Sequence, residues 1–142
     1  MSYARHTVAL CLLLGGCGTV DVGPPLPDIN ACRPSQAFFA QQVWPNFLAK
    51  DYGGRRCSNG GCHDTGSGRQ LVLSDPGTPL TVPLPAEWSR VYRSAAQQLL
   101  CTNVAASPLL ARPDGRQTHG GQKLIDPDGP EEMLVKMWVS AP

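Results

Sequence analysis

One short run constrains this chain more than any other feature: residues 57–63 read Cys-Ser-Asn-Gly-Gly-Cys-His. The spacer between the two cysteines ends in two glycines, which favour a loop over a helix or a strand. A loop of this kind can bulge outward while its ends stay close. We therefore expect the thiols of Cys57 and Cys62 and the imidazole of His63 to lie near one another, with the rest of the fold built around them.

Two thiols followed directly by a histidine are typical of c-type haem attachment. In that chemistry the thiols bond the vinyl groups of haem, and the adjacent histidine becomes the proximal iron ligand. The run therefore predicts haem c, attached through Cys57 and Cys62, with His63 as the proximal ligand. The usual motif has two residues between the cysteines, whereas four separate them here.

The second axial ligand of such an iron must come from a distant segment. His119 is the main candidate, because the two glycines that follow it let the backbone approach a flat ring closely. Met133 and Met137 are alternatives, although methionines on the apolar stripe of a helix usually fill the core. Iron ligated on both faces transfers electrons and leaves no site for a substrate, so the chain is not expected to be an enzyme. An open axial position would instead permit peroxidase-like chemistry.

Two other interpretations of the same residues stay open. Zinc has a permitted set of four ligands in Cys57, Cys62, His63 and His119. A plain disulfide between Cys57 and Cys62 would make the chain a haem-free, disulfide-stapled lipoprotein that acts as a binding or structural module.

The N-terminus is typical of an exported protein. Arg5 provides a positive charge, and residues 8–14 form an apolar run that is too short to span a bilayer. Residues 14–17, Leu-Gly-Gly-Cys, resemble the lipobox of bacterial lipoproteins. The resemblance implies that residues 1–16 are a signal peptide and that Cys17 carries a lipid after cleavage.

Composition then limits the partners of the mature chain. Residues 17–31 are rich in proline and glycine and predict a flexible tether, which leaves residues 32–142 as one small domain. Loss of Arg5 with the signal leaves 11 basic residues against 11 acidic ones, which argues against a nucleic-acid partner. Membrane contact is expected through the lipid alone, at the periplasmic or outer-membrane side of the cell envelope.

Four cysteines remain in the mature domain: Cys32, Cys57, Cys62 and Cys101. In an exported chain they should be oxidised or occupied, and they allow three disulfide pairings among which the sequence does not choose. If Cys57 and Cys62 hold haem, Cys32 and Cys101 are left as one pair.

The periodicity of apolar residues predicts a mostly α domain of three to four short helices with long loops. Helices are expected over residues 35–50 and 85–100, in a single turn over 107–110, and from residue 130 onward. Residues 64–84 and 113–130 are expected to be loops. This is a small core for so many loop residues, so a covalent haem and a disulfide would both help to hold it.

Local signals refine these helices. Ser35 is a plausible N-cap, Pro45 should kink or restart the first helix, and Asp128 with Glu131 resembles a capping box. Met133 and Met137 are expected on the apolar stripe of the last helix together with Leu134 and Trp138. The predicted core aromatics around the ring are Trp44, Trp88, Tyr92 and Trp138.

Three patches of the sequence resemble small cytochrome c domains of the type common in exported proteins of planctomycetes and myxobacteria. They are residues 43–48 before the cysteine loop, residues 107–121 with their His-Gly-Gly stretch, and the closing segment 133–139. The resemblance implies a cytochrome c-like fold, His119 in the distal-ligand region, and one-electron transfer with redox partner proteins of the envelope. A pair of histidine ligands predicts a lower reduction potential than a His/Met pair.

Overall fold

The computed structural model describes residues 33–58, 62–120 and 122–141, and within these ranges it is helical with no strand. The predicted mostly α class is therefore confirmed. The elements in chain order are α1 (Gln36–Phe38), η1 (Phe39–Leu48), α2 (Ala86–Ala96), η2 (Val104–Ala106), α3 (Pro108–Ala111) and α4 (Pro130–Ser140). Residues 64–84 form no helix, and residues 113–120 and 122–129 form none, as expected of these two loops.

The first helix, α1 continued by η1, begins where the sequence predicts. Ser35 is its N-cap and accepts a hydrogen bond from the backbone N–H of Phe38 at 3.3 Å. We expected Pro45 to kink or restart the helix, but η1 runs through it without a restart, as a wider π-helix. Proline cannot donate a backbone hydrogen bond, and the π form accommodates it, with the N–H of Ala49 bonding the carbonyl of Trp44 at 2.8 Å.

Helix α2 ends four residues earlier than the apolar pattern predicts. After Ala96 the chain tightens, and the N–H of Leu99 bonds the carbonyl of Ala96 at 3.1 Å. The next N–H, that of Leu100, is taken by the buried hydroxyl of Ser107 at 2.8 Å. A side-chain acceptor from the following segment thus replaces the helical acceptor, which the pattern of apolar residues could not reveal. Ser107 is also the N-cap of α3, the predicted single turn.

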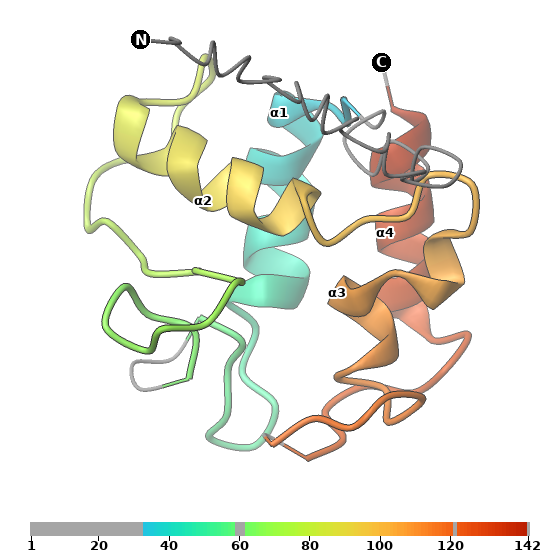
Figure 1. The fold of residues 1–142 in the computed structure, drawn as a ribbon. Coiled ribbons are helices and arrows are strands. Elements are labelled where there is room, and N and C mark those ends of the chain that lie inside the picture. Colours follow the sequence, from blue (N-terminus) through green and yellow to red (C-terminus); the bar gives the residue numbers. More distant parts are fainter. Residues whose placement is uncertain (1–32, 59–61, 121, 142) are drawn as a thin grey trace, which may run out of the picture.

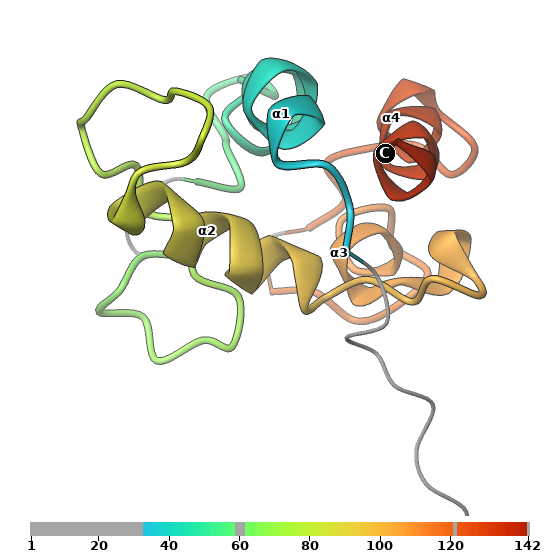
Figure 2. The same ribbon diagram turned by 90° about the horizontal axis from the view of Figure 1, so that it is seen from above.

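Helix α4 lies alongside the first helix (Figures 1 and 2). In the view of Figure 1, α2 passes in front of the first helix. Trp138 of α4 is fully buried, and its indole N–H donates to the carbonyl of Ser35 at 3.0 Å. Its ring lies 5.5 Å from that of Phe39 and 6.0 Å from that of Tyr92, between centroids. Trp44 and Trp88 meet edge to face at 4.7 Å. The predicted burial of Trp44, Trp88 and Trp138 is therefore confirmed, whereas Tyr92 is only partly buried against this core.

Two local predictions for α4 are wrong. The N-cap is Gly129 and no side chain caps the helix, because Glu131 turns away to bind Lys50. Met133 and Met137 are 60% and 51% exposed, so they do not belong to a buried stripe. The buried positions of this helix are Glu131, Glu132, Val135 and Trp138. The two acidic residues among them face the protein, where basic side chains neutralise their charge.

Glu132 is the centre of a buried charge cluster. Its side chain is 1% exposed, with Arg116 Nη2 2.8 Å from Oε2 and Lys136 Nζ 2.8 Å from Oε1. The backbone N–H of Asp128 also donates to Oε2, at 3.3 Å. These partners, Lys136 foremost, hold the pKa of Glu132 below its ordinary value although burial opposes them.

We expect Glu132→Gln to lower the free energy of unfolding by about 1.5–3 kcal/mol at pH 7, since it removes hydrogen bonds to charged partners. A carboxylate whose folded pKa is lowered stabilises the protein above its unfolded pKa, about 4.3, and loses that contribution as the pH falls through the folded value. The difference from the wild type should therefore shrink below about pH 4, as measured by urea unfolding across pH. Asp126→Asn, at an 81% exposed carboxylate paired with Lys123, is the control and should cost little. An equal cost at all pH values would contradict the charge-based account.

The predicted signal peptide, lipidated Cys17, tether and Cys32 lie outside the described residues. Within the described ranges, no helix is long and apolar enough to cross a bilayer.

Candidate functional site

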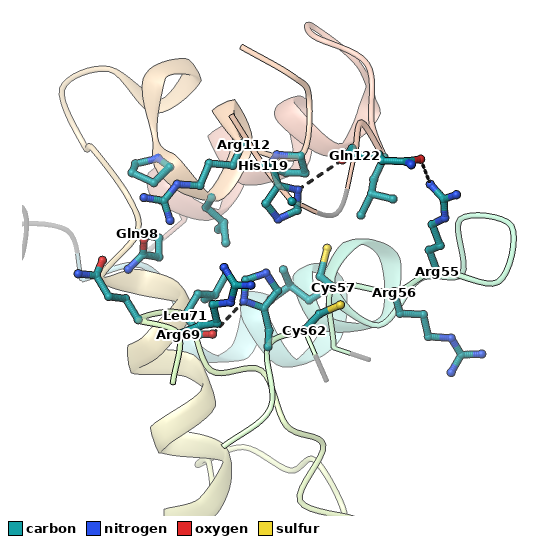
Figure 3. A pocket seen from close by; sticks show the side chains of 18 of the residues that line it. Arg55, Arg56, Cys57, Cys62, Arg69, Leu71, Gln98, Arg112, His119 and Gln122 are labelled. Carbon is teal, nitrogen blue, oxygen red and sulfur yellow. Dashed lines mark hydrogen bonds between the residues drawn. The ribbon is translucent and has the colours of Figure 1, made fainter. Parts of the chain in front are cut away.

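A pocket of about 890 Å³ opens between two stretches of chain that are far apart in sequence. One wall comes from the cysteine loop and the segment up to Leu71, and the other from α3 and the loop that carries His119. Phe47, Leu48, Leu109 and Leu124 add apolar surface. Its volume lies within the range of small-molecule and cofactor sites, about 300–1,000 Å³. Figure 3 shows Cys57, Cys62 and Leu71 on one side of the pocket and His119 with Arg112 on the other.

His63 and His119 meet across this pocket. Their ring centroids are 6.0 Å apart and their planes differ by only 8°. Nδ1 of His63 lies 3.0 Å from the carbonyl oxygen of Leu71, and Nδ1 of His119 lies 3.3 Å from that of Gln122. A carbonyl only accepts, so each Nδ1 donates to it, and in a neutral imidazole this arrangement leaves the lone pair on Nε2. Two imidazoles are thus held in the tautomer that binds a metal through Nε2.

The separation of the rings suits one metal ion between them. An imidazole nitrogen binds a metal at about 2.0 Å, and the ring centre lies roughly 1.2 Å behind that nitrogen. Two imidazoles on opposite sides of one ion therefore have centres roughly 6.4 Å apart. The observed 6.0 Å is close to this value. Within the described ranges, no three or more Cys, His, Asp or Glu side chains gather around one metal position, so the structure does not assemble the tetrahedral set expected for zinc.

The two cysteines of the loop, Cys57 and Cys62, line the same pocket as free thiols, so the structure does not contain the disulfide between them that was the alternative interpretation. Cys57 is buried, and the N–H of the next residue, Ser58, bonds the carbonyl of Leu48, which attaches the loop to the end of η1 at 3.0 Å. Cys62 is exposed. Burial raises the pKa of Cys57 to about 12, whereas Cys62 stands open to solvent. Cys101 is disulfide-bonded, and its predicted partner Cys32 lies outside the described residues.

This difference predicts unequal thiol reactivity in the haem-free protein. At pH 8 we expect iodoacetamide to modify Cys62 at least about tenfold faster than Cys57, because the thiolate is the reactive form and Cys57 is both buried and protonated. Timed alkylation followed by peptide mass spectrometry measures both rates. In the urea-unfolded chain the two rates should converge, which is the control. Equal rates in the folded protein would contradict the described burial of Cys57.

The pocket is strongly basic. Arg55, Arg56, Arg69 and Arg112 line it, and no Asp or Glu is found among the described residues of its lining. Arg56 is paired with Asp51 at 3.5 Å, while the guanidinium groups of Arg69 and Arg112 make no ion pair or hydrogen bond with any described residue. Such a lining favours an anionic ligand.

The same charges act on His63. Burial is the main cause that lowers the pKa of His63, and the nearby His119, Arg69 and Arg112 lower it further, against the hydrogen bond to Leu71. The ring is therefore held in the neutral form, which is the form that ligates a metal.

All four residues proposed from sequence as haem ligands or attachment sites, Cys57, Cys62, His63 and His119, line this one pocket. Met133 and Met137 are exposed on α4 and do not line it. The predicted aromatic core does not line it either; Phe47 is its aromatic wall.

Sequence reasoning missed the arginines and Gln122. A weak signal was present, since Arg69 follows His63 by six residues and Arg112 precedes His119 by seven.

No protein-family model matches this chain, and no curated protein and no solved structure is similar to it at a significant level.

Proposed function

We propose that this chain is a haem c-binding lipoprotein that carries out one-electron transfer at the cell envelope, anchored through a lipid on Cys17. The observation that carries the proposal is the pair of imidazoles, His63 and His119, 6.0 Å apart beside two free thiols in one pocket. A disulfide between Cys32 and Cys101 remains part of the proposal.

The lining residues suit the group in charge and in chemistry. Each thiol, of Cys57 and of Cys62, would add across one vinyl group, so that a carbon–sulfur bond forms and the thiol proton passes to the other vinyl carbon, with no oxidant consumed. Arg69 and Arg112 would pair with the two propionate charges, since both guanidinium groups are free among the described residues. The leucines of the lining would exclude water from the ring.

Haem bound here would supply a one-electron redox centre. His63 and His119 would both hold the haem iron through Nε2, and an iron held by two protein ligands favours electron transfer over peroxidase-like chemistry. The carbonyls of Leu71 and Gln122 would accept the Nδ1 protons, orient the rings and increase their basicity.

The decisive experiment is a reduced-minus-oxidised visible spectrum of the mature protein, produced in a host with cytochrome c maturation. Sharp reduced bands that stay with the denatured chain are expected, and the double variant Cys57→Ser/Cys62→Ser should lose them. Ser58→Ala, in the same loop, is the matched control and should retain them, because it keeps the N–H that bonds Leu48.

The absence of haem from a host that matures a control cytochrome would overturn the proposal. It would favour the haem-free, disulfide-stapled lipoprotein instead.

A further inference from the structure

Gln122 occupies an unusual place beside the pocket. It is one of two described residues other than glycine with a positive φ, 65°, a conformation that is costly for a side chain and persists where surrounding contacts enforce it. Its backbone N–H donates to the carbonyl of His119 at 3.2 Å, and its own carbonyl accepts from the His119 ring. Gln122 therefore clamps His119 from both of its backbone groups.

The side chain of Gln122 reaches to the other wall. Nη1 of Arg55 donates to its Oε1 at 2.7 Å, across a sequence separation of 67 residues (Figure 3). Arg55 itself is attached to the core, because its carbonyl accepts from the N–H of Tyr52 at 2.8 Å, and the Tyr52 hydroxyl lies 3.3 Å from Glu131. The bond thus connects the His119 loop with the loop that carries the cysteines.

The His119 loop is otherwise attached near α3. The N–H of Gln117 bonds the carbonyl of Ala111 at 2.6 Å, and that of Leu124 bonds the carbonyl of Pro113 at 2.7 Å. These bonds hold its two ends on its own side of the pocket. Among the described residues, the Arg55–Gln122 bond is the hydrogen bond that joins this loop to the opposite wall of the pocket. It therefore holds the two walls at their observed separation beside His119.

We propose that Arg55 and Gln122 are positioning residues for His119, and that their bond, here called the latch, controls how readily His119 yields its place to another ligand. The inference rests on the proposed function, because it assigns a role toward the distal iron ligand. A bound histidine exchanges with an external ligand only from the fraction of molecules in which it has swung away. Breaking the latch increases that fraction and leaves the ligand itself unchanged.

The test uses the ferric haem protein and cyanide as the external ligand, followed by the shift of the Soret band. Both members of the latch are exposed, so water competes for the bond and the effect is moderate. We expect Arg55→Ala and Gln122→Gly each to speed cyanide binding about threefold to tenfold. The double variant should be no faster than either single one, since both remove the same bond.

The variants are chosen to separate the latch from the turn. Glycine adopts a φ of 65° without strain, so Gln122→Gly keeps the backbone clamp on His119 and removes the side chain alone. Arg90→Ala removes an exposed arginine of α2 that does not line the pocket, and should bind cyanide at the wild-type rate. Arg55→Lys keeps the charge and should restore part of the wild-type behaviour.

A second readout needs no haem. In the haem-free protein, hydrogen exchange of the Gln122 amide should quicken in Arg55→Ala, because that amide bonds His119, and stay unchanged in Arg90→Ala. If the wild type holds haem but Arg55→Ala and Gln122→Gly bind cyanide at its rate, the latch proposal is overturned and the proposed function stands. If the wild type holds no haem, the proposed function fails and the latch's role toward an iron ligand fails with it, whatever the exchange data show about the loop.

Discussion

Replacing Trp138 by alanine is expected to lower the free energy of unfolding by about 3–5 kcal/mol, the largest loss that any one side chain of this core should cause. Trp138 is fully buried, contacts the rings of Phe39 and Tyr92, and bonds the carbonyl of Ser35. Its removal would leave a cavity between α4 and the first helix, and the carbonyl of Ser35 would keep only its bond from the backbone N–H of Phe39. A loss of this size is comparable with the whole stability of many small domains.

Urea unfolding followed by far-UV circular dichroism measures this loss in the haem-free protein. Met137→Ala is the matched control, because Met137 is the preceding residue on α4 and is 51% exposed. Its expected effect is within about 0.5 kcal/mol. Trp138→Phe should cost less than Trp138→Ala, since it keeps part of the ring packing, although it loses the rest of that packing and the indole hydrogen bond. Similar losses at Trp138 and Met137 would show that α4 does not pack as described.

The second large effect is expected at His119 in the haem protein. His119→Ala should leave the covalent haem in place but remove one iron ligand, so that the low-spin spectrum becomes high-spin and carbon monoxide binds the reduced protein. His119→Met should restore a second ligand and raise the reduction potential by on the order of 100 mV or more. Visible spectra and redox titration measure both changes.

The control for His119 lies in the same loop. Gln117→Ala keeps the backbone N–H that bonds Ala111, and Gln117 does not line the pocket, so its spectrum and potential should match the wild type. A low-spin spectrum in His119→Ala, with no carbon monoxide binding, would exclude His119 as the distal ligand. The variants Met133→Ala and Met137→Ala would then test the alternatives that the sequence suggested.

Much of the helical framework could be predicted from local signals. The N-cap at Ser35, the turn after Ser107 and the helix from Pro130 all depend on residues within a few positions of each other. The errors arose where a distant partner overrode the local preference. The end of α2 depends on the hydroxyl of Ser107, and Glu131, expected in a capping box, is drawn to Lys50, 81 residues away.

The candidate site divides in the same way. The spacing of Cys57, Cys62 and His63 can be seen directly in the sequence. The two glycines after His119 indicate that its loop can approach a ligand closely. Nothing local indicates that Arg55 would reach Gln122, or that Arg69 and Arg112 would line one pocket, because these arrangements exist only after the two walls have come together. The sequence alone therefore could not predict the basic lining of the pocket or the latch between Arg55 and Gln122.

The three tryptophans of the core are separate from the side chains that line the pocket. All three tryptophans lie in the core cluster, and none of them lines the cavity. The contacts of these tryptophans do not depend on a ligand in the pocket. We therefore expect the helical core to fold before any ligand binds there. If haem is attached as proposed, it would need access only to a pocket between two loops of an already folded domain, and tryptophan fluorescence would report on that fold independently of haem.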